Sequence, residues 1–105
     1  MTGARGEVWL YERPQRKPRP VLILVRSEAI ARLNRILVVP STSAGARNIP
    51  THVWIDEEDG MREPCALVLD ETFAARKDFL THRITMLGAA KMDEVCRALA
   101  AASSC

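Results

Sequence analysis

The chain has 105 residues and a formal net charge of +2, with 48% hydrophobic and 27% charged residues. This length allows one domain, residues 1–105, and the composition excludes a disordered or fibrous protein. The longest apolar run, Val21 to Val25, is far shorter than the roughly 20 residues that a membrane-spanning helix needs. The N-terminal residues also lack the apolar stretch of a secretory signal, so we expect a cytoplasmic protein that does not bind a membrane.

Short apolar segments in the first half of the chain predict strands. The first strand is Gly6 to Tyr11, and Val21 to Val25 is a continuous aliphatic run typical of a strand buried on both faces. Between them, Arg13 to Pro20 contains three prolines and four cations, and the prolines exclude a helix or a central strand. A short helix over Glu28 to Asn34 is expected next, with Ser27 as its N-cap.

The rest of the chain predicts more short strands and one long helix. The remaining expected elements are strands at Ile36 to Pro40, Thr51 to Ile55, Ala66 to Leu69 and Arg83 to Leu87, a turn at Asp56 to Gly60, and an irregular polar segment at Asp70 to Asp78. After Ala89, one apolar helical stripe consists of Met92, Val95, Cys96 and Leu99. Five or six short strands and one terminal amphipathic helix predict an α+β domain on a small, curved or barrel-like sheet.

The two halves of the chain carry opposite charge. Residues 1–50 contain nine Lys or Arg against three Asp or Glu, whereas residues 51–105 contain six against ten. A basic half is suited to a polyanion such as nucleic acid, but exposed arginines also occur on ordinary solvated surfaces. Charge alone leaves both interpretations open.

Cysteine and histidine chemistry is sparse in this sequence. The three cysteines are odd in number and widely spaced, which argues against a disulfide scaffold or a zinc site. We expect Cys65 and Cys96 to be buried and Cys105 to be exposed. His52 and His82 are the only histidines, and structural roles are favoured for them over a paired ribonuclease site.

A basic residue and a hydroxyl-bearing residue stand at the ends of two predicted core strands. Arg19 precedes the VLILV strand, and Thr42 follows the ILVVP strand. If these strands are neighbours, both side chains can face one groove. A guanidinium binds two phosphate oxygens at once, and a hydroxyl donates to an oxygen that gains charge, which suits phosphodiester chemistry. Taken alone, the residues favour plainer roles, with Arg19 covering a strand edge and Thr42 capping a turn.

Over residues 6–102 the chain resembles MazF/PemK/Kid-type toxin endoribonucleases. The segments that carry the resemblance, in the order and spacing of the family, are GEVWL, KPRPVLIL, ILVVPSTS, IPTHVWI, CALVLDE and HRITMLGAAKMDEVCRALA. The resemblance implies a small SH3-like β-barrel with a short connecting helix and a C-terminal amphipathic helix, assembled as a homodimer. It also implies cleavage of single-stranded RNA at short motifs without a metal or other cofactor, and neutralisation by a cognate antitoxin.

By that resemblance, Arg19 matches the active-site arginine of the family and Thr42 matches its active-site serine or threonine. The implied reaction is attack of a ribose 2′-hydroxyl on the adjacent phosphate, which leaves a 2′,3′-cyclic phosphate and a 5′-hydroxyl. An arginine is a poor general base, so the base stays open, with Glu12, Glu71 and His52 as secondary candidates. The other residues predicted to contact RNA are Arg13, Arg16, Lys17, Ser41, Ser43, Glu71, Arg76 and Lys77.

The chain departs from the family pattern in one place. Family members commonly carry an Asp/Glu-Gln-Ile-Arg-like run where this chain has Asp70-Glu71-Thr72-Phe73, and Arg76 and Lys77 are candidates to replace the missing charge. Phe73 is a candidate for stacking on a base, whereas Trp9 is assigned to the core. This departure keeps two alternatives open: a non-catalytic RNA- or antitoxin-binding module, and a gyrase-inhibiting toxin on the same barrel.

Overall fold

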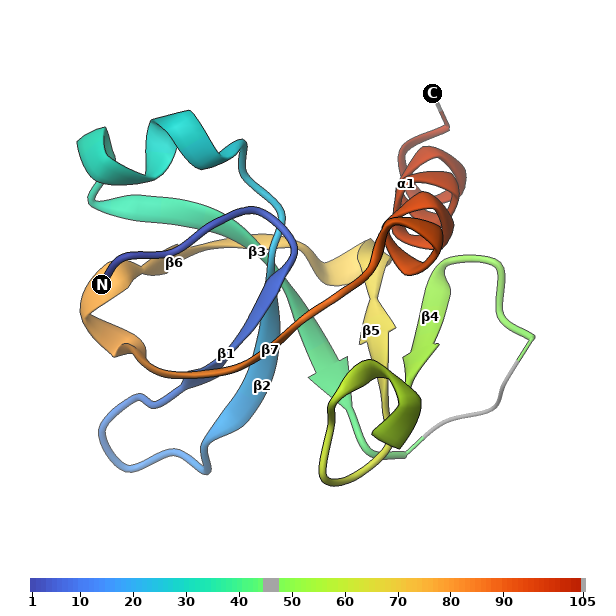
Figure 1. Ribbon diagram of the computed structural model, residues 1–105, viewed down its shortest axis with the longest axis horizontal. Helices are drawn as coiled ribbons and strands as arrows, with labels where there is room; N and C mark the ends of the chain where they lie inside the picture. Colours follow the sequence, from blue (N-terminus) through green and yellow to red (C-terminus); the bar gives the residue numbers. More distant parts are fainter. Residues whose placement is uncertain (45–47, 105) are drawn as a thin grey trace.

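A strongly curved antiparallel sheet with one C-terminal helix forms the protein (Figure 1). The computed structural model describes residues 1–44 and 48–104. Its strands are β1 (Glu7–Tyr11), β2 (Arg19–Ile23), β3 (Arg35–Thr42), β4 (His52–Ile55), β5 (Cys65–Val68), β6 (Phe73–Arg76) and β7 (Leu80–Met86), and the helix is α1 (Ala89–Ser103). Four 3-10 turns connect them: η1 (Ser27–Arg32), η2 (Glu57–Asp59), η3 (Leu69–Glu71) and η4 (Lys77–Phe79).

The strand order is β4-β5-β3-β2-β1-β7, and β6 pairs with β3 beside this path. The eight-residue β3 is shared by three partners, because it pairs with β2, with β5 near its end and with β6 near its start. Such sharing bends the sheet into a half-barrel, with η1 at one end and α1 packed against β4 and η3 at the other (Figure 1). The predicted α+β class with a curved barrel-like sheet is confirmed.

Both faces of the central strands are buried. The side chains of β2 alternate between two apolar clusters, since Leu22 belongs to the cluster beneath α1 and Val21 and Ile23 belong to the cluster inside the half-barrel. Each of these three side chains is at most 1% exposed. The prediction of a strand buried on both faces is therefore confirmed for Val21 to Ile23, where β2 ends, and Trp9, which is 8% exposed, lies in the core as predicted.

Three sequence-based predictions of local structure are wrong. The short helix is present as the six-residue 3-10 helix η1, but Ser27 is its first residue and not its N-cap, and the Ser27 hydroxyl accepts the N–H of Arg5 at 2.8 Å instead. Cys96 is exposed, because α1 turns Val95 and Ala98 toward the sheet. The segment from Asp70 to Asp78 contains strand β6, which lacks a local strand pattern and forms because β3 offers it a pairing edge.

The other cysteine predictions have different outcomes. Cys65 is buried as expected, whereas Cys105 lies outside the described residues. Among the described residues, no helix is both long and apolar enough to span a membrane.

Candidate functional site

The ladder between β2 and β3 runs toward Arg19 and Thr42, although Thr42 is not among the residues that line the Arg19 pocket described below. Val21, Leu22 and Ile23 lie opposite Pro40, Val39 and Val38 in the antiparallel ladder. Extending this register by two residues places Arg19, the first residue of β2, opposite Thr42, the last residue of β3. Directly opposed residues share one face of a sheet, with Cβ atoms about 4.5–5.5 Å apart. The two strands are thus neighbours, as a shared groove requires.

The hydroxyl of Thr42 contacts the turn that follows it. It donates to the carbonyl of Ala44 at 3.0 Å, and the N–H of Ala44 lies 3.3 Å from the same oxygen. The local turn role that the residues alone favoured is therefore present. A hydroxyl in such a turn is held at the end of its strand, and its rotation would free the proton for a ligand.

Aromatic residues lie at both ends of the row that contains Arg19 and Thr42. The strand registers place Tyr11 opposite Arg19, Ala66 opposite Thr42, and Trp54 opposite Ala66. These side chains therefore share one face across β1, β2, β3, β5 and β4. The rings of Tyr11 and Phe73 pack edge to face with their centroids 5.4 Å apart, so Phe73 packs against another side chain of the protein here.

A small pocket of about 140 Å³ opens beside this row. Its lining residues are Lys17, Pro18, Arg19, Pro20, Ser41, Ser43, Glu63, Pro64 and Cys65. Four of the predicted site residues thus lie together, namely Lys17, Arg19, Ser41 and Ser43. The sequence analysis missed Glu63 and Cys65, because only the pairing of β5 with β3 brings residues 63–65 to the end of β3.

Hydrogen bonding and burial define the chemistry of this pocket. The Ser41 hydroxyl donates to the carbonyl of Pro20 at 2.6 Å, which links β3 to β2 at the pocket. Burial raises the pKa of the Cys65 thiol, and the hydrogen bond with Ser41 opposes that shift only in part. Cys65 is therefore a neutral thiol at pH 7 and a poor nucleophile.

The remaining predicted RNA contacts separate into different regions. Arg13 and Arg16 are exposed in the β1–β2 loop, and the Arg13 guanidinium lies 5.2 Å from the centre of the Tyr11 ring. Glu71 is exposed on η3 and does not line the Arg19 pocket. Arg76 and Lys77 belong to a second basic cluster at the far end of β3.

That second basic cluster lines a pocket of about 360 Å³ formed by Asn34, Arg35, Arg76, Lys77 and Asp78. Arg35 and Arg76 lie directly opposite each other across β3 and β6. Arg76 forms an ion pair with Asp78 at 2.7 Å, and Lys77 donates to the carbonyl of Ile30 at 2.7 Å. Arg35 and Thr42 are at opposite ends of the eight-residue β3, about 23 Å apart at the usual rise per residue.

The two histidines lie in separate surroundings. His82 on β7 is exposed, and its Nδ1 lies 3.4 Å from Glu12. His52 on β4 lines a pocket of about 310 Å³ with Asn48, Ile49, Val53, Trp54, Ala66 and Glu94. Within the described residues, His52 Nδ1 is buried without a hydrogen-bond partner. The structure gives the two imidazoles no shared pocket, so a two-histidine site has no support.

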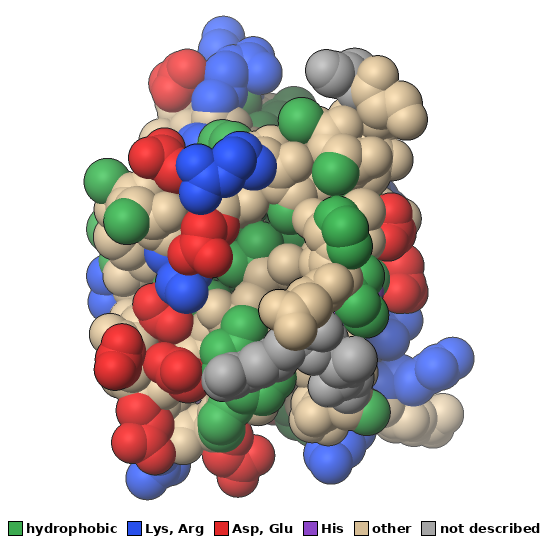
Figure 2. All heavy atoms as spheres, turned by 90° about the vertical axis from the view of Figure 1, so that its right-hand side faces the viewer, with side chains coloured by type: hydrophobic (Ala, Val, Ile, Leu, Met, Phe, Trp, Pro, Cys, Tyr) green, Lys and Arg blue, Asp and Glu red, His purple; other side chains and the backbone are tan. Residues whose placement is uncertain are grey.

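The side of the molecule that carries β4, η2 and α1 differs from the basic loop in charge. Figure 2 shows acidic side chains gathered on one part of this side, next to exposed hydrophobic side chains. The acidic residues of η2 are Glu57, Glu58 and Asp59. The β1–β2 loop in turn contributes Lys17 to the lining of the Arg19 pocket.

Comparisons with known proteins agree with this fold. A family model described as "PemK-like, MazF-like toxin of type II toxin-antitoxin system" matches residues 4–102. The "Probable endoribonuclease MazF5" of Mycobacterium tuberculosis (strain ATCC 25618 / H37Rv) is 35% identical over 103 residues, which cover 97% of this chain and 94% of that protein. The chain belongs to this toxin family. The resemblance inferred from the sequence is confirmed.

Solved structures show the same MazF-like fold. "Mycobacterium tuberculosis toxin MazF-mt6" superposes with a TM-score of 0.83 at 26% identity, covering 93% of this chain and 96% of that one. An "Endoribonuclease in complex with its cognate antitoxin from Mycobacterial species" superposes with a TM-score of 0.83 at 24% identity, covering 97% of this chain and 95% of that one. The likeness to the second structure concerns the fold.

Proposed function

We propose that the protein, a MazF-type endoribonuclease toxin, cleaves single-stranded RNA at a site built on Arg19 and Thr42 and without a metal ion. The observation that supports the proposal is the register of β2 and β3, which on extension by two residues sets Arg19 opposite Thr42, beside a pocket that Arg19 lines. No ion pair within 4 Å holds Arg19 in the described part of the chain, so its guanidinium is available to a phosphate.

The chemistry follows from the charge that develops during cleavage. The ribose 2′-oxygen attacks the neighbouring phosphorus, the bond from phosphorus to the 5′-oxygen breaks, and a 2′,3′-cyclic phosphate and a 5′-hydroxyl form. Negative charge builds up on the non-bridging oxygens, where Arg19 and the Thr42 hydroxyl donate hydrogen bonds. Removal of one such donor typically lowers the rate about 10²- to 10³-fold.

The surroundings of the pocket suit a single RNA strand. The loop cations Arg13, Arg16 and Lys17 would bind phosphates, and Ser41 and Ser43 would lie along the same rim. The pocket lined by His52 and Trp54 is on the face that also carries Thr42, and it is polar enough to receive a nucleobase. Stacking of a base on an aromatic ring contributes about 1–3 kcal/mol.

The second basic cluster would bind a more distant part of the RNA. Arg35 and Arg76 are like charges directly opposite each other, an arrangement that is unfavourable until an anion binds between them. We assign Arg76 and Lys77 to phosphates several nucleotides away from the cleaved bond. Glu71, also predicted at the RNA surface, would lie at the side of that path.

Two protein partners belong to the proposal. The first is a second copy of the chain, because the proposed active form is a homodimer. The second is a cognate antitoxin, since the family is that of type II toxin–antitoxin systems. An acidic antitoxin segment would compete with RNA for the basic loop and for Arg19.

The test is cleavage of total RNA by the purified protein in the presence of EDTA, with mapping of new 5′-hydroxyl ends. Arg19→Ala and Thr42→Val should each lose at least about 10²-fold in rate while melting at the wild-type temperature. Arg26→Ala is the matched control, because Arg26 is an exposed arginine paired with Glu28 outside the pocket. Full cleavage by both site variants would refute the proposal.

Other outcomes would favour the alternatives. RNA binding without new 5′-hydroxyl ends would indicate a binding module. Inhibition of DNA supercoiling by gyrase, without RNA cleavage, would indicate a gyrase-inhibiting toxin.

A further inference from the structure

Glu63 is a carboxylate in the pocket that the proposed reaction uses. It lines this pocket together with Arg19, Lys17, Ser41 and Ser43, and it is the only acidic residue of the lining. No ion pair within 4 Å engages Glu63, Lys17 or Arg19 in the part of the chain that the structure describes. Glu63 therefore forms no ion pair with Lys17 or Arg19 inside the pocket.

The fold fixes where Glu63 lies. Ala66 of β5 is directly opposite Thr42, so Glu63 comes three residues before the partner of the proposed catalytic threonine. On its other side the segment follows η2, a turn closed by a capping box between Asp56 and Asp59. Glu63 thus sits between two anchored elements.

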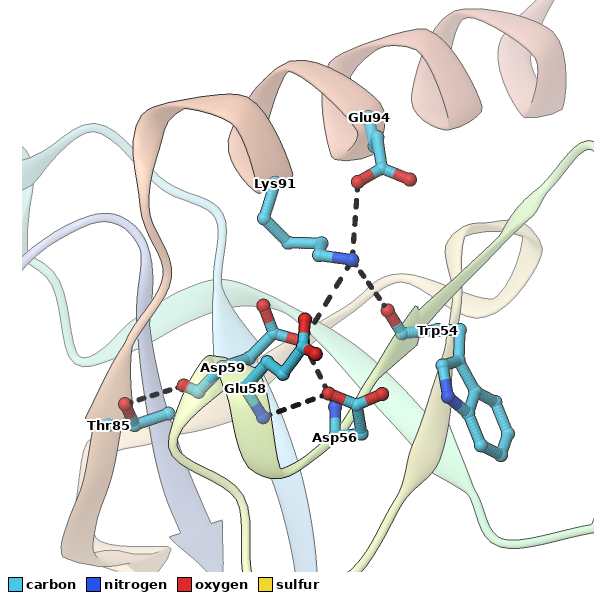
Figure 3. A network of polar contacts seen from close by, with 7 residues as sticks. All are labelled: Trp54, Asp56, Glu58, Asp59, Thr85, Lys91 and Glu94. Atoms are coloured by element: carbon cyan, nitrogen blue, oxygen red, sulfur yellow. Dashed lines mark hydrogen bonds and ion pairs between the residues drawn. The ribbon is translucent and has the colours of Figure 1, made fainter.

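Polar contacts tie η2 to the rest of the protein (Figure 3). Lys91 of α1 points toward this turn, where its ammonium donates to the carbonyl of Trp54 at 3.1 Å and lies 3.9 Å from the Asp59 carboxylate. The Thr85 hydroxyl of β7 donates to the carbonyl of Asp59 at 2.8 Å (Figure 3). These bonds connect the turn before Glu63 to β4, β7 and α1, so the carboxylate extends from a supported loop.

A carboxylate in this place weakens RNA binding. The pocket must accept a phosphate, and a negative charge in its lining repels it. Glutamine or serine would serve binding better, so the useful property of Glu63 is one that only a carboxylate has. In a reaction that begins by removing a proton from a 2′-hydroxyl, that property is basicity.

We infer that Glu63 is the general base of the RNA cleavage, an assignment that rests on the proposed function. Its carboxylate takes the proton of the 2′-hydroxyl as the bond from the 2′-oxygen to phosphorus forms. The bond from phosphorus to the 5′-oxygen breaks, and the departing 5′-oxygen takes a proton from water. Glu63 then returns its proton to solvent, so protons balance and no oxidant, reductant or cofactor takes part.

The base candidates named from the sequence lie elsewhere. Glu12 bonds to Thr81 and lies 3.4 Å from His82, and none of these three lines the Arg19 pocket. Glu71 is on η3, outside that lining, and His52 lines the neighbouring pocket with Trp54. Of Glu12, Glu71, His52 and Glu63, it is Glu63 that lines the described pocket containing Arg19.

The experiment compares Glu63→Gln and Glu63→Asp with wild type and with Glu57→Gln, an exposed glutamate of η2 outside the pocket. The substrate is a defined single-stranded RNA that wild type cuts. The binding probe is the same RNA with 2′-deoxyribose at the cleaved nucleotide, which cannot react. Single-turnover rates are measured from about pH 4 to 9, affinities by fluorescence anisotropy, and folding by thermal melting.

The inference predicts opposite changes in rate and affinity. Glu63→Gln should lose about 10²- to 10⁴-fold in rate, as expected for a lost general base, and should lose the fall in rate at acidic pH. Its affinity for the deoxy probe should stay equal or increase, because a negative charge is removed. Glu63→Asp should recover part of the rate, and Glu57→Gln should match wild type.

Two results would overturn the base assignment while leaving the proposed function intact. One is a Glu63→Gln rate and pH profile equal to those of wild type. The other is a parallel loss of rate and affinity, which would make Glu63 a positioning residue. Absence of cleavage by wild type on any RNA would instead overturn the proposed function, and the assignment with it.

Discussion

Gly60 combines a positive φ with the closest contact that an added methyl group would meet at any glycine the structure describes. Its φ is +93°, in the left-handed region, and it ends the η2 turn that precedes Glu63. A Cβ atom here would lie 2.2 Å from Thr85 Oγ1 and 2.9 Å from Thr85 Cβ. The Thr85 hydroxyl is the donor to the carbonyl of Asp59, so the methyl group would displace a side chain that holds the turn.

The cost of Gly60→Ala has two parts. Placing alanine in the left-handed region costs about 1–2 kcal/mol. Losing the hydrogen bond between Thr85 and Asp59 costs about 0.5–1.5 kcal/mol. We therefore expect the free energy of unfolding to fall by about 1.5–3.5 kcal/mol, which lowers the melting temperature of a domain of this size by roughly 6–28 °C.

Urea and thermal unfolding of Gly60→Ala and Gly88→Ala provide the assay. Gly88 is the matched control, because its φ is −75° and nothing lies within 4 Å of a Cβ placed there. We expect Gly88→Ala to change the unfolding free energy by less than about 1 kcal/mol. Equal stability of the two variants would refute the reasoning about the turn. Because the turn directly precedes the segment with Glu63, Gly60→Ala should also lower the cleavage rate at a temperature where it remains folded.

Three further predictions concern charge. Burial by itself raises the pKa of Glu7, but hydrogen bonds from Arg83, Trp9 and the N–H of Ala4 outweigh burial and leave the pKa below its usual value of 4.5. The Glu7 carboxylate therefore stabilises the fold above pH 4.5, and this contribution is lost as the pH falls through the lowered pKa. Glu7→Gln should therefore flatten the acid side of the stability curve, and an unchanged curve measured by urea unfolding from pH 2.5 to 7 would contradict this. Neutralising one β1–β2 loop cation, as in Lys17→Ala, should weaken RNA binding and reduce the slope of log affinity against log salt concentration by about 0.7. An affinity that falls by the same factor at every salt concentration, with an unchanged slope, would exclude a phosphate contact of Lys17. Arg35→Glu should weaken binding of RNAs long enough to span β3 and spare shorter ones that still contain the cleaved motif, and an equal effect on both lengths would remove the second basic cluster from the RNA path.

The sequence by itself determined the elements whose signals are local. The uninterrupted aliphatic run from Val21 to Val25 identified the doubly buried strand β2, which covers Val21 to Ile23 of that run, because such a run has no polar face to expose. The spacing of apolar residues after Ala89 identified α1 for the same kind of reason. The resemblance over residues 6–102 then added the fold, the toxin family and the candidate pair Arg19 and Thr42.

The tertiary structure decided everything that depends on pairing between distant segments. Phe73–Arg76 became β6 because β3 has a free edge there, not because of its own pattern. Cys96 faces solvent because the packing of α1 on β4 and η3 sets the rotation of the helix about its axis. The apolar stripe in the sequence determines this rotation only to within one residue position. Glu63 lies in the Arg19 pocket because β5 pairs with the end of β3. Arg76 lies away from this pocket because β6 pairs with the other end of β3. Register joins residues far apart in the chain, and no local spacing encodes it.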